Sequence, residues 1–162
     1  EILTYTLSLA ADPPQGGTVS GAGVYEHGTA ATLTAQPAAG YAFAGWRGDL
    51  DGTDNPVTIT ISENKTVTAA FEILTYTLSL AADPPQGGTV SGAGVYAHDA
   101  QAEASAAPAP GWSFVEWREN GGRVSGDALY PFAMTGDRAL TAHFSQEGPS
   151  HRVLLPMIIR DR

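Results

Sequence analysis

The chain has 162 residues and a net charge of −9, charged side chains make up only 15% of it, and it contains no cysteine. An acidic surface repels nucleic-acid phosphates and anionic membranes, so neither is an expected partner; without cysteine, disulfides and thiolate metal sites are excluded. No apolar run reaches the roughly 18 residues that would predict a membrane-spanning helix.

The chain contains an internal repeat, because Glu1–Tyr25 returns unchanged as Glu72–Tyr96. Such a period indicates tandem modules rather than one domain. We predict modules at residues 1–71 and 72–144, followed by a linker and apolar tail at residues 145–162. The identity stops abruptly after the repeated block, which indicates sequence exchange between copies rather than a selected binding surface. Since Glu1 occupies a repeat boundary, we expect further protein upstream.

The elements of the first module are expected to be strands, because apolar and polar residues alternate with a period of two. Asp12–Gly17 combines proline and glycine and predicts a turn. Alanine-rich Ala100–Ala109 has helical propensity, but its counterpart Ala30–Ala38 contains threonines, so both are interpreted as strand and loop. The strands are expected at residues 4–10, 18–20, 23–25, 29–34, 41–46, 57–61 and 66–71, with matching strands in the second module.

These patterns predict a mainly β protein made of two tandem small antiparallel β domains, β-grasp-like or small sandwiches, plus a C-terminal tail. Between Trp117 and Phe144 the second copy is two residues longer than the first between Trp46 and Phe71, which predicts a loop insertion there.

The first module carries Tyr-Thr-Leu, then Pro-Gln-Gly-Gly-Thr-Val, then Gly-Tyr-x-Phe-x-Gly-Trp, and closes with Val-Thr-Ala-x-Phe. This signature resembles the divergent InlB B-repeat, related to the Listeria–Bacteroides repeats. The likeness covers residues 3–71 well and residues 74–144 less well, because Glu116 and the segment Glu119–Gly122 depart from it. The resemblance implies extracellular β modules that serve as spacers or adhesive arms on secreted or surface-attached bacterial proteins. It implies no catalytic residue.

Aromatic residues recur at matched positions in the two modules. We interpret Trp46 and Trp117 as core anchors, because one aromatic side chain buries on the order of 150–250 Å² and small modules need such anchors. Tyr41 and its counterpart Trp112 are expected to be partly exposed. They are the candidate aromatic contacts for a ligand such as a sugar ring.

The polar motifs give weaker signals. The histidine that recurs in each module, His27 or His98, supplies neither a catalytic triad nor a metal site by itself. Asp49–Asn55 has a calcium-like composition, but it lacks EF-hand spacing and is not reproduced in the second module, so we interpret it as a solvated loop. Asn64–Thr66 matches a glycosylation sequon and is expected to be a turn. No metal site, cofactor or catalytic residue is predicted.

The tail combines apolar residues with arginines around Pro156. Exposed, such a segment would promote aggregation, so we expect it to be buried by adding a strand to its own module or to another molecule. A frayed terminus is the alternative. The candidate interface residues are Val153, Leu154, Leu155, Met157, Ile158 and Ile159.

Together the sequence predicts a non-enzymatic extracellular or cell-surface module that acts as a structural spacer or adhesion arm, with the tail used for anchoring or assembly. The expected partners are other protein chains or copies of itself, and cell-wall or extracellular polysaccharide. Two alternatives remain open. One is a carbohydrate-binding accessory module of a secreted hydrolase, and the other is a filament subunit that donates its tail as a strand.

Overall fold

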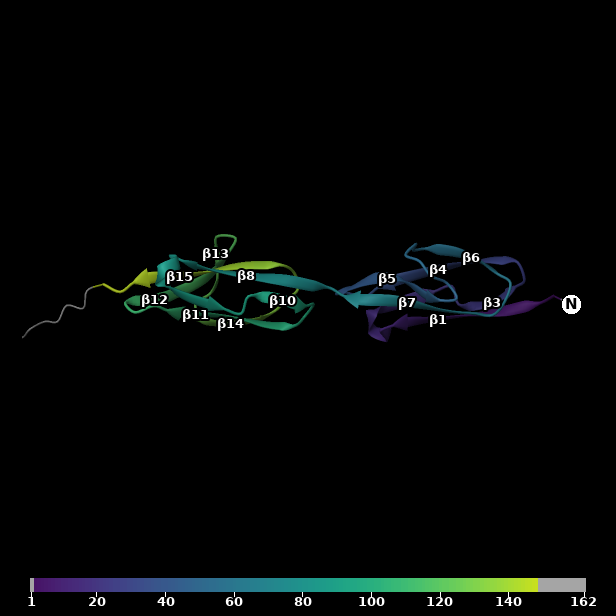
Figure 1. Ribbon diagram of the computed structural model, residues 1–162, viewed down its shortest axis with the longest axis horizontal. Helices are drawn as coiled ribbons and strands as arrows, with labels where there is room; N and C mark the ends of the chain where they lie inside the picture. Colours follow the sequence, from purple (N-terminus) through teal and green to yellow (C-terminus); the bar gives the residue numbers. More distant parts are fainter. Residues whose placement is uncertain (1, 149–162) are drawn as a thin grey trace, which may run out of the picture. The chain divides into compact units, whose positions relative to one another are not determined.

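The computed structural model describes residues 2–148, and the chain divides into two compact units (Figure 1). The predicted tail interface, Val153 to Ile159, lies outside the described residues. The first repeat contains β1 (Thr4–Asp12), the short 3-10 turn η1 (Pro14–Gly16), β2 (Gly17–Ser20), β3 (Gly23–Glu26), β4 (Thr29–Pro37), β5 (Tyr41–Gly48), β6 (Val57–Ile61) and β7 (Lys65–Ile73).

The second repeat follows the same order with one additional strand. It contains β8 (Thr75–Asp83), η2 (Pro85–Gly87), β9 (Gly88–Ser91), β10 (Gly94–Ala97), β11 (Gln101–Pro108), β12 (Trp112–Glu119), β13 (Gly122–Ser125), β14 (Leu129–Ala133) and β15 (Arg138–Gln146). No helix in the described part of the chain is long and apolar enough to cross a membrane.

The alternation of the sequence becomes an alternation of burial. Along β4, Leu33 is fully buried while the flanking Thr32 and Thr34 are exposed. This is the two-residue period of a strand with one face on the core and one in solvent. The alanine-rich segment of the second repeat forms strand β11, so the expectation of strand rather than helix is confirmed.

Each repeat is a two-layer β-sandwich. In the first repeat one sheet has the order β3-β1-β7-β5 and the other β2-β4-β6. Their inner faces enclose a single core, to which Leu7, Leu33 and Trp46 contribute from three strands. Trp46 is 2% exposed and its counterpart Trp117 is fully buried, which confirms their interpretation as core anchors. The mainly β class is confirmed, and the form it takes is the small sandwich.

The first and last strands of each repeat are neighbours and run parallel. Strand β1 pairs with β7 from Leu7↔Lys65 to Asp12↔Ala70, and the two strands can be followed in Figure 1. Strand β8 pairs with β15 in the same way. The other ladders with an assigned register among the described residues are antiparallel, as expected. Because the terminal strands are parallel, the chain enters and leaves each repeat at opposite ends.

The additional strand of the second repeat occupies the predicted loop insertion. Strand β13 forms a hairpin with β12, in which Glu119 pairs with Gly122. The two turn residues, Asn120 and Gly121, both have positive φ. Asn-Gly suits such a turn because both residues tolerate the left-handed region. The first repeat has only an isolated bridge, Trp46↔Gly52, near this position.

The second repeat also carries an ion pair beside two aromatic rings. Arg138 Nη2 lies 2.6 Å from Glu119 Oε2, and its guanidinium lies 4.2 Å from the ring centroid of Phe132. The hydrogen bond to Glu119 raises the pKa of Arg138 above its ordinary value, so the guanidinium stays charged. Lys65 stands at the corresponding place in the first repeat and pairs with Glu63.

A pair of glycines where η1 meets β2, and again where η2 meets β9, allows the phenylalanine at the end of the repeat to pack on the chain. A Cβ on Gly16 would lie 2.6 Å from Cβ of Phe71, and one on Gly87 would lie 2.6 Å from Cβ of Phe144. Separations this short are not tolerated, so the close approach requires glycine. Both phenylalanines are buried, at 4% and 6% exposure.

We predict that Gly87→Ala lowers the stability of the second repeat by about 1–3 kcal/mol, the usual cost of overpacking. The matched control is Gly136→Ala, because a Cβ there would meet no atom within 4 Å. Urea unfolding followed by tryptophan fluorescence measures both variants. Equal midpoints for the two would contradict the packing argument.

Candidate functional site

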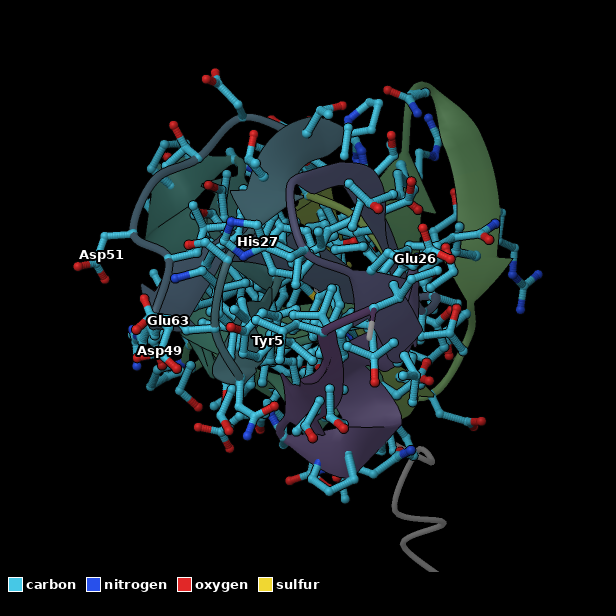
Figure 2. The ribbon with its side chains drawn as sticks, turned by 90° about the vertical axis from the view of Figure 1, so that its right-hand side faces the viewer. Tyr5, Glu26, His27, Asp49, Asp51 and Glu63 are labelled. Carbon is cyan, nitrogen blue, oxygen red and sulfur yellow. The ribbon has the colours of Figure 1, made fainter. Side chains whose placement is uncertain are left out.

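The acidic loop Asp49–Asn55 is tied to the fold by its own polar groups. Asp49 Oδ2 accepts a 2.7 Å hydrogen bond from the Thr66 amide, and the Asp54 carbonyl accepts one of 2.9 Å from the Trp46 indole. Asp51 is exposed, and in Figure 2 it points away from the ribbon. Within residues 2–148 no three histidine, aspartate or glutamate side chains form a group that could hold a metal ion. The loop therefore supports Trp46 rather than presenting a converging ligand set.

The sequon residue Asn64 caps the first strand. Its Oδ1 accepts a 2.8 Å hydrogen bond from the Thr6 amide. In the second repeat Asp137 stands at this place and accepts a 2.7 Å bond from the Thr77 amide. The side-chain oxygen common to both residues is the group that accepts the hydrogen bond from the strand amide. The turn expected at Asn64–Thr66 is not found there, because Lys65 and Thr66 belong to β7, and the chain bends at Ser62 and Glu63 instead. The asparagine has a structural role.

The two histidines that recur between the repeats, His27 and His98, each lie beside a tyrosine. The ring centroids of Tyr5 and His27 are 5.9 Å apart, and those of Tyr76 and His98 are also 5.9 Å apart. Tyr5 and His27 are labelled in Figure 2. His98 Nε2 additionally lies 3.4 Å from an Asp99 carboxylate oxygen. Within the described chain neither histidine is part of a metal-binding group.

The predicted aromatic contacts occupy equivalent positions on separate repeats. Tyr41 opens β5 and is half-buried, and its amide donates a 3.0 Å bond to the Ala38 carbonyl. Trp112 opens β12 and is also half-buried. Its ring lies 3.2 Å from where a Cβ on Gly87 would stand, and it therefore packs against the η2 turn. Their role in ligand binding stays a prediction.

A different surface of the first repeat gathers polar groups that sequence reasoning missed. The outer side of the β2-β4-β6 sheet carries exposed hydroxyl and carboxamide side chains, which we call the hydroxyl face. Its members are Thr18, Ser20, Thr32, Thr34, Gln36, Thr58 and Thr60.

The hydroxyl face is ordered by strand pairing. Ser20 stands opposite Thr34, and Thr32 stands opposite Thr58 with their hydroxyl oxygens 3.1 Å apart. The signal was present in the sequence, because the outward residues of the strands around Leu33 and Ile59 are threonines. Only the inward residues of that alternation were used to predict the fold.

At one end the hydroxyl face continues into a groove of about 450 Å³. Thr18 and Gln36, a cross-strand pair, belong to both the face and the groove. Prolyl rings, carboxamides and a hydroxyl line the groove, and none of its lining side chains is charged. The lining residues are Pro14, Gln15, Gly17, Thr18, Gln36, Pro37 and Ala38.

The two sandwiches define a tandem β-repeat protein, in which one scaffold is built twice from related sequence. The divergent InlB B-repeat domain family matches residues 7–74 and again residues 78–148, and the chain belongs to this family. Repeats of this kind are typical of extracellular or cell-surface bacterial proteins and are generally non-catalytic. No curated protein matches the chain.

We predict that Asn64→Ala and Asp137→Ala each lower stability by about 1 kcal/mol, because each leaves a strand amide without its side-chain acceptor. Asn64→Asp is the matched control, since it installs the residue of the second repeat and keeps the acceptor oxygen. Thermal unfolding by circular dichroism measures the three variants. A full loss of stability in Asn64→Asp would show that the oxygen is not the group that matters.

Proposed function

We propose that the chain is a tension-bearing spacer or adhesion arm of a secreted or cell-surface bacterial protein and not an enzyme. One observation carries the proposal: the first and last strands of each repeat form a parallel ladder. An arm that holds two bodies apart is pulled at its two ends, and this ladder connects the two ends of the repeat.

Parallel terminal strands resist such a pull in shear. A force on the start of β1 and the end of β7 acts along the strands in opposite directions, so the ladder from Leu7 to Asp12 is loaded all at once. An antiparallel hairpin pulled at its open end separates one bond after another. Both strands also lie inside the sheet, since β1 pairs with β3 and β7 pairs with β5. Neither can detach without breaking a second ladder.

The join between the repeats suits this role. Strand β7 ends at Ile73 and β8 begins at Thr75, so a single residue, Leu74, separates them. A connection this short adds no slack, and force on one terminal strand passes along the chain to the next.

We base the proposal that the chain is not an enzyme on the side chains of its interior. Among residues 2–148 no polar or charged side chain is fully buried. Catalytic groups are commonly desolvated so that their pKa values suit the reaction, and the described residues offer no such set.

The tail completes the proposal: its apolar residues around Pro156 would serve anchoring or assembly at the end of the arm.

We predict that the repeats resist shear more strongly than unzipping. The chain has no cysteine, so engineered thiols provide unique attachment points. Ile2→Cys with Glu72→Cys loads the parallel ladder in shear. Ile2→Cys with Glu63→Cys pulls at the same end of both strands and unzips it, because the bond from Thr6 to Asn64 places those positions together. Single-molecule stretching should give a clearly higher rupture force for the shear pair.

Two features of the traces test the proposal further. The intact chain pulled from its ends should show two ruptures, each releasing roughly 200 Å, as expected for about 70 residues at ~3.5 Å each less the folded length. Equal rupture forces in shear and unzipping would contradict a tension-bearing role.

The tail is tested by solution mass. If the tail promotes assembly, light scattering across a range of concentrations should show growing oligomers, and deletion of residues 148–162 should abolish them. A monomer that is unchanged by the deletion would leave anchoring to a separate partner and would contradict self-assembly.

A further inference from the structure

We propose that the hydroxyl face of the first repeat, together with its groove, binds an uncharged, hydroxyl-rich polysaccharide, and that the second repeat does not. The proposal goes beyond the spacer role, because a repeat can resist tension without binding any glycan.

The first argument is chemical. The chain carries a net charge of −9, yet the hydroxyl face and the groove lining contain no charged side chain. Hydroxyls and carboxamides both donate and accept hydrogen bonds, which matches the hydroxyl groups of a neutral sugar. An anionic ligand would find no cation on this surface, and a cationic one would find no carboxylate.

The second argument is the regular spacing of the groups. Outward side chains repeat every second residue along each strand, roughly 6.5–7 Å apart, and strands are spaced by about 4.8 Å. Thr32 and Thr58 form one cross-strand row, and Ser20 and Thr34 form the next. These spacings are comparable to the length of a sugar residue. Threonine also presents a methyl group beside each hydroxyl, which suits the mixed polar and apolar surface of a sugar ring.

The third argument is the groove. Its volume of about 450 Å³ falls within the roughly 300–1,000 Å³ typical of small-molecule sites. The carboxamides of Gln15 and Gln36 and the hydroxyl of Thr18 supply orienting groups, while Pro14 and Pro37 supply apolar surfaces. Since the groove and the hydroxyl face share Thr18 and Gln36, one extended chain can lie on the face and place a sugar unit in the groove.

The fourth argument is rigidity. Asn55 fixes the backbone of β4 at Ala35, because its Oδ1 accepts a 2.9 Å bond from the Ala35 amide and its Nδ2 donates a 2.6 Å bond to the Ala35 carbonyl. Beside the groove, Gly16 and Gly17 pack directly against Phe71. A surface that is already fixed loses little entropy when a ligand binds.

The second repeat supplies an internal comparison. Its counterpart of the groove keeps the prolines, Gln86 and Thr89, but Ala107 replaces Gln36. On the face, Glu103 replaces Thr32 and introduces a negative charge. The two threonines of β6 are replaced by Pro131 and Ala133. The scaffold is therefore preserved, while four of the seven polar groups of the hydroxyl face, those of Thr32, Gln36, Thr58 and Thr60, are lost.

The test measures binding of the full chain to soluble neutral polysaccharides, with dextran, a mixed-linkage β-glucan and galactomannan as probes and polygalacturonate as the acidic comparison. Retardation in affinity gel electrophoresis identifies the binding probe. Calorimetry with its oligosaccharide then gives the stoichiometry. We expect retardation by at least one neutral probe, none by polygalacturonate, and one site per chain.

Two substitutions import the residues of the second repeat: Gln36→Ala and Thr32→Glu. Each should weaken binding at least fivefold, corresponding to about 1 kcal/mol. Ser8→Glu is the matched control, because Ser8 is exposed on the other sheet, and it should bind as the unmodified chain does. Unfolding midpoints establish that all three variants remain folded.

Three outcomes would overturn the proposal: no retardation by any neutral probe, binding unchanged in both groove and face variants, or two equivalent sites per chain. None of them bears on the spacer role, which depends on rupture forces. Conversely, equal rupture forces in shear and unzipping would leave the glycan result standing.

Discussion

The parallel ladder between the first and last strands determines the architecture of each repeat. Parallel neighbours cannot be joined by a tight turn, so the intervening chain must cross the module before β7 returns beside β1. The remaining strands complete that crossing: β3 and β5 extend the sheet on either side of the pair, while β2, β4 and β6 form the second layer. Closure comes at the end of the repeat, where Phe71 packs on Gly16 and Gly17.

A module of this size buries only a small hydrophobic core, and the side chains of its interior reflect this limit. The inner face of β4 consists of Ala31, Leu33 and Ala35, and the small alanines leave room for the large Trp46. The indole N–H of Trp46 donates to the Asp54 carbonyl, so even the largest buried side chain has its polar atom satisfied. Trp117 repeats the arrangement with the Ala128 carbonyl at 3.3 Å. The loops that vary between the repeats still supply this carbonyl.

Much of the fold was predictable from the sequence, because burial follows the two-residue period. Leu7, Leu33 and Phe71 all lie where alternation places them. The direction of pairing was not predictable, since an alternating strand looks the same beside a parallel or an antiparallel neighbour. Strand β13 goes beyond the predicted loop insertion, although Asn120-Gly121 is a strong hairpin signal in the sequence.

The candidate site was less predictable than the fold for a physical reason. An outward threonine has no required partner, so Thr34 or Thr58 reads as an ordinary solvent-facing residue until the strands are placed side by side. Only the register shows that Thr18 stands opposite Gln36 and that both border the groove. Trp112, the aromatic contact predicted from the sequence, lies elsewhere, and its ring packs against the η2 turn.

The two repeats are identical over their first part and differ over the rest, where some substitutions face solvent and others, such as Ala104 for Leu33, lie in the core. The segment identical in both supplies the first strand, the glycine pair and the prolyl turn, which are the parts that closure requires. The divergent segment supplies β4 and β6 in one repeat and β11 and β14 in the other, whose outer sides bury nothing. Substitution there, such as Glu103 for Thr32, changes surface chemistry at little cost to the core. A scaffold whose terminal strands form one ladder can therefore vary the opposite sheet, and this separation is what the two proposals, a tension-bearing arm and a ligand surface on one repeat, both require.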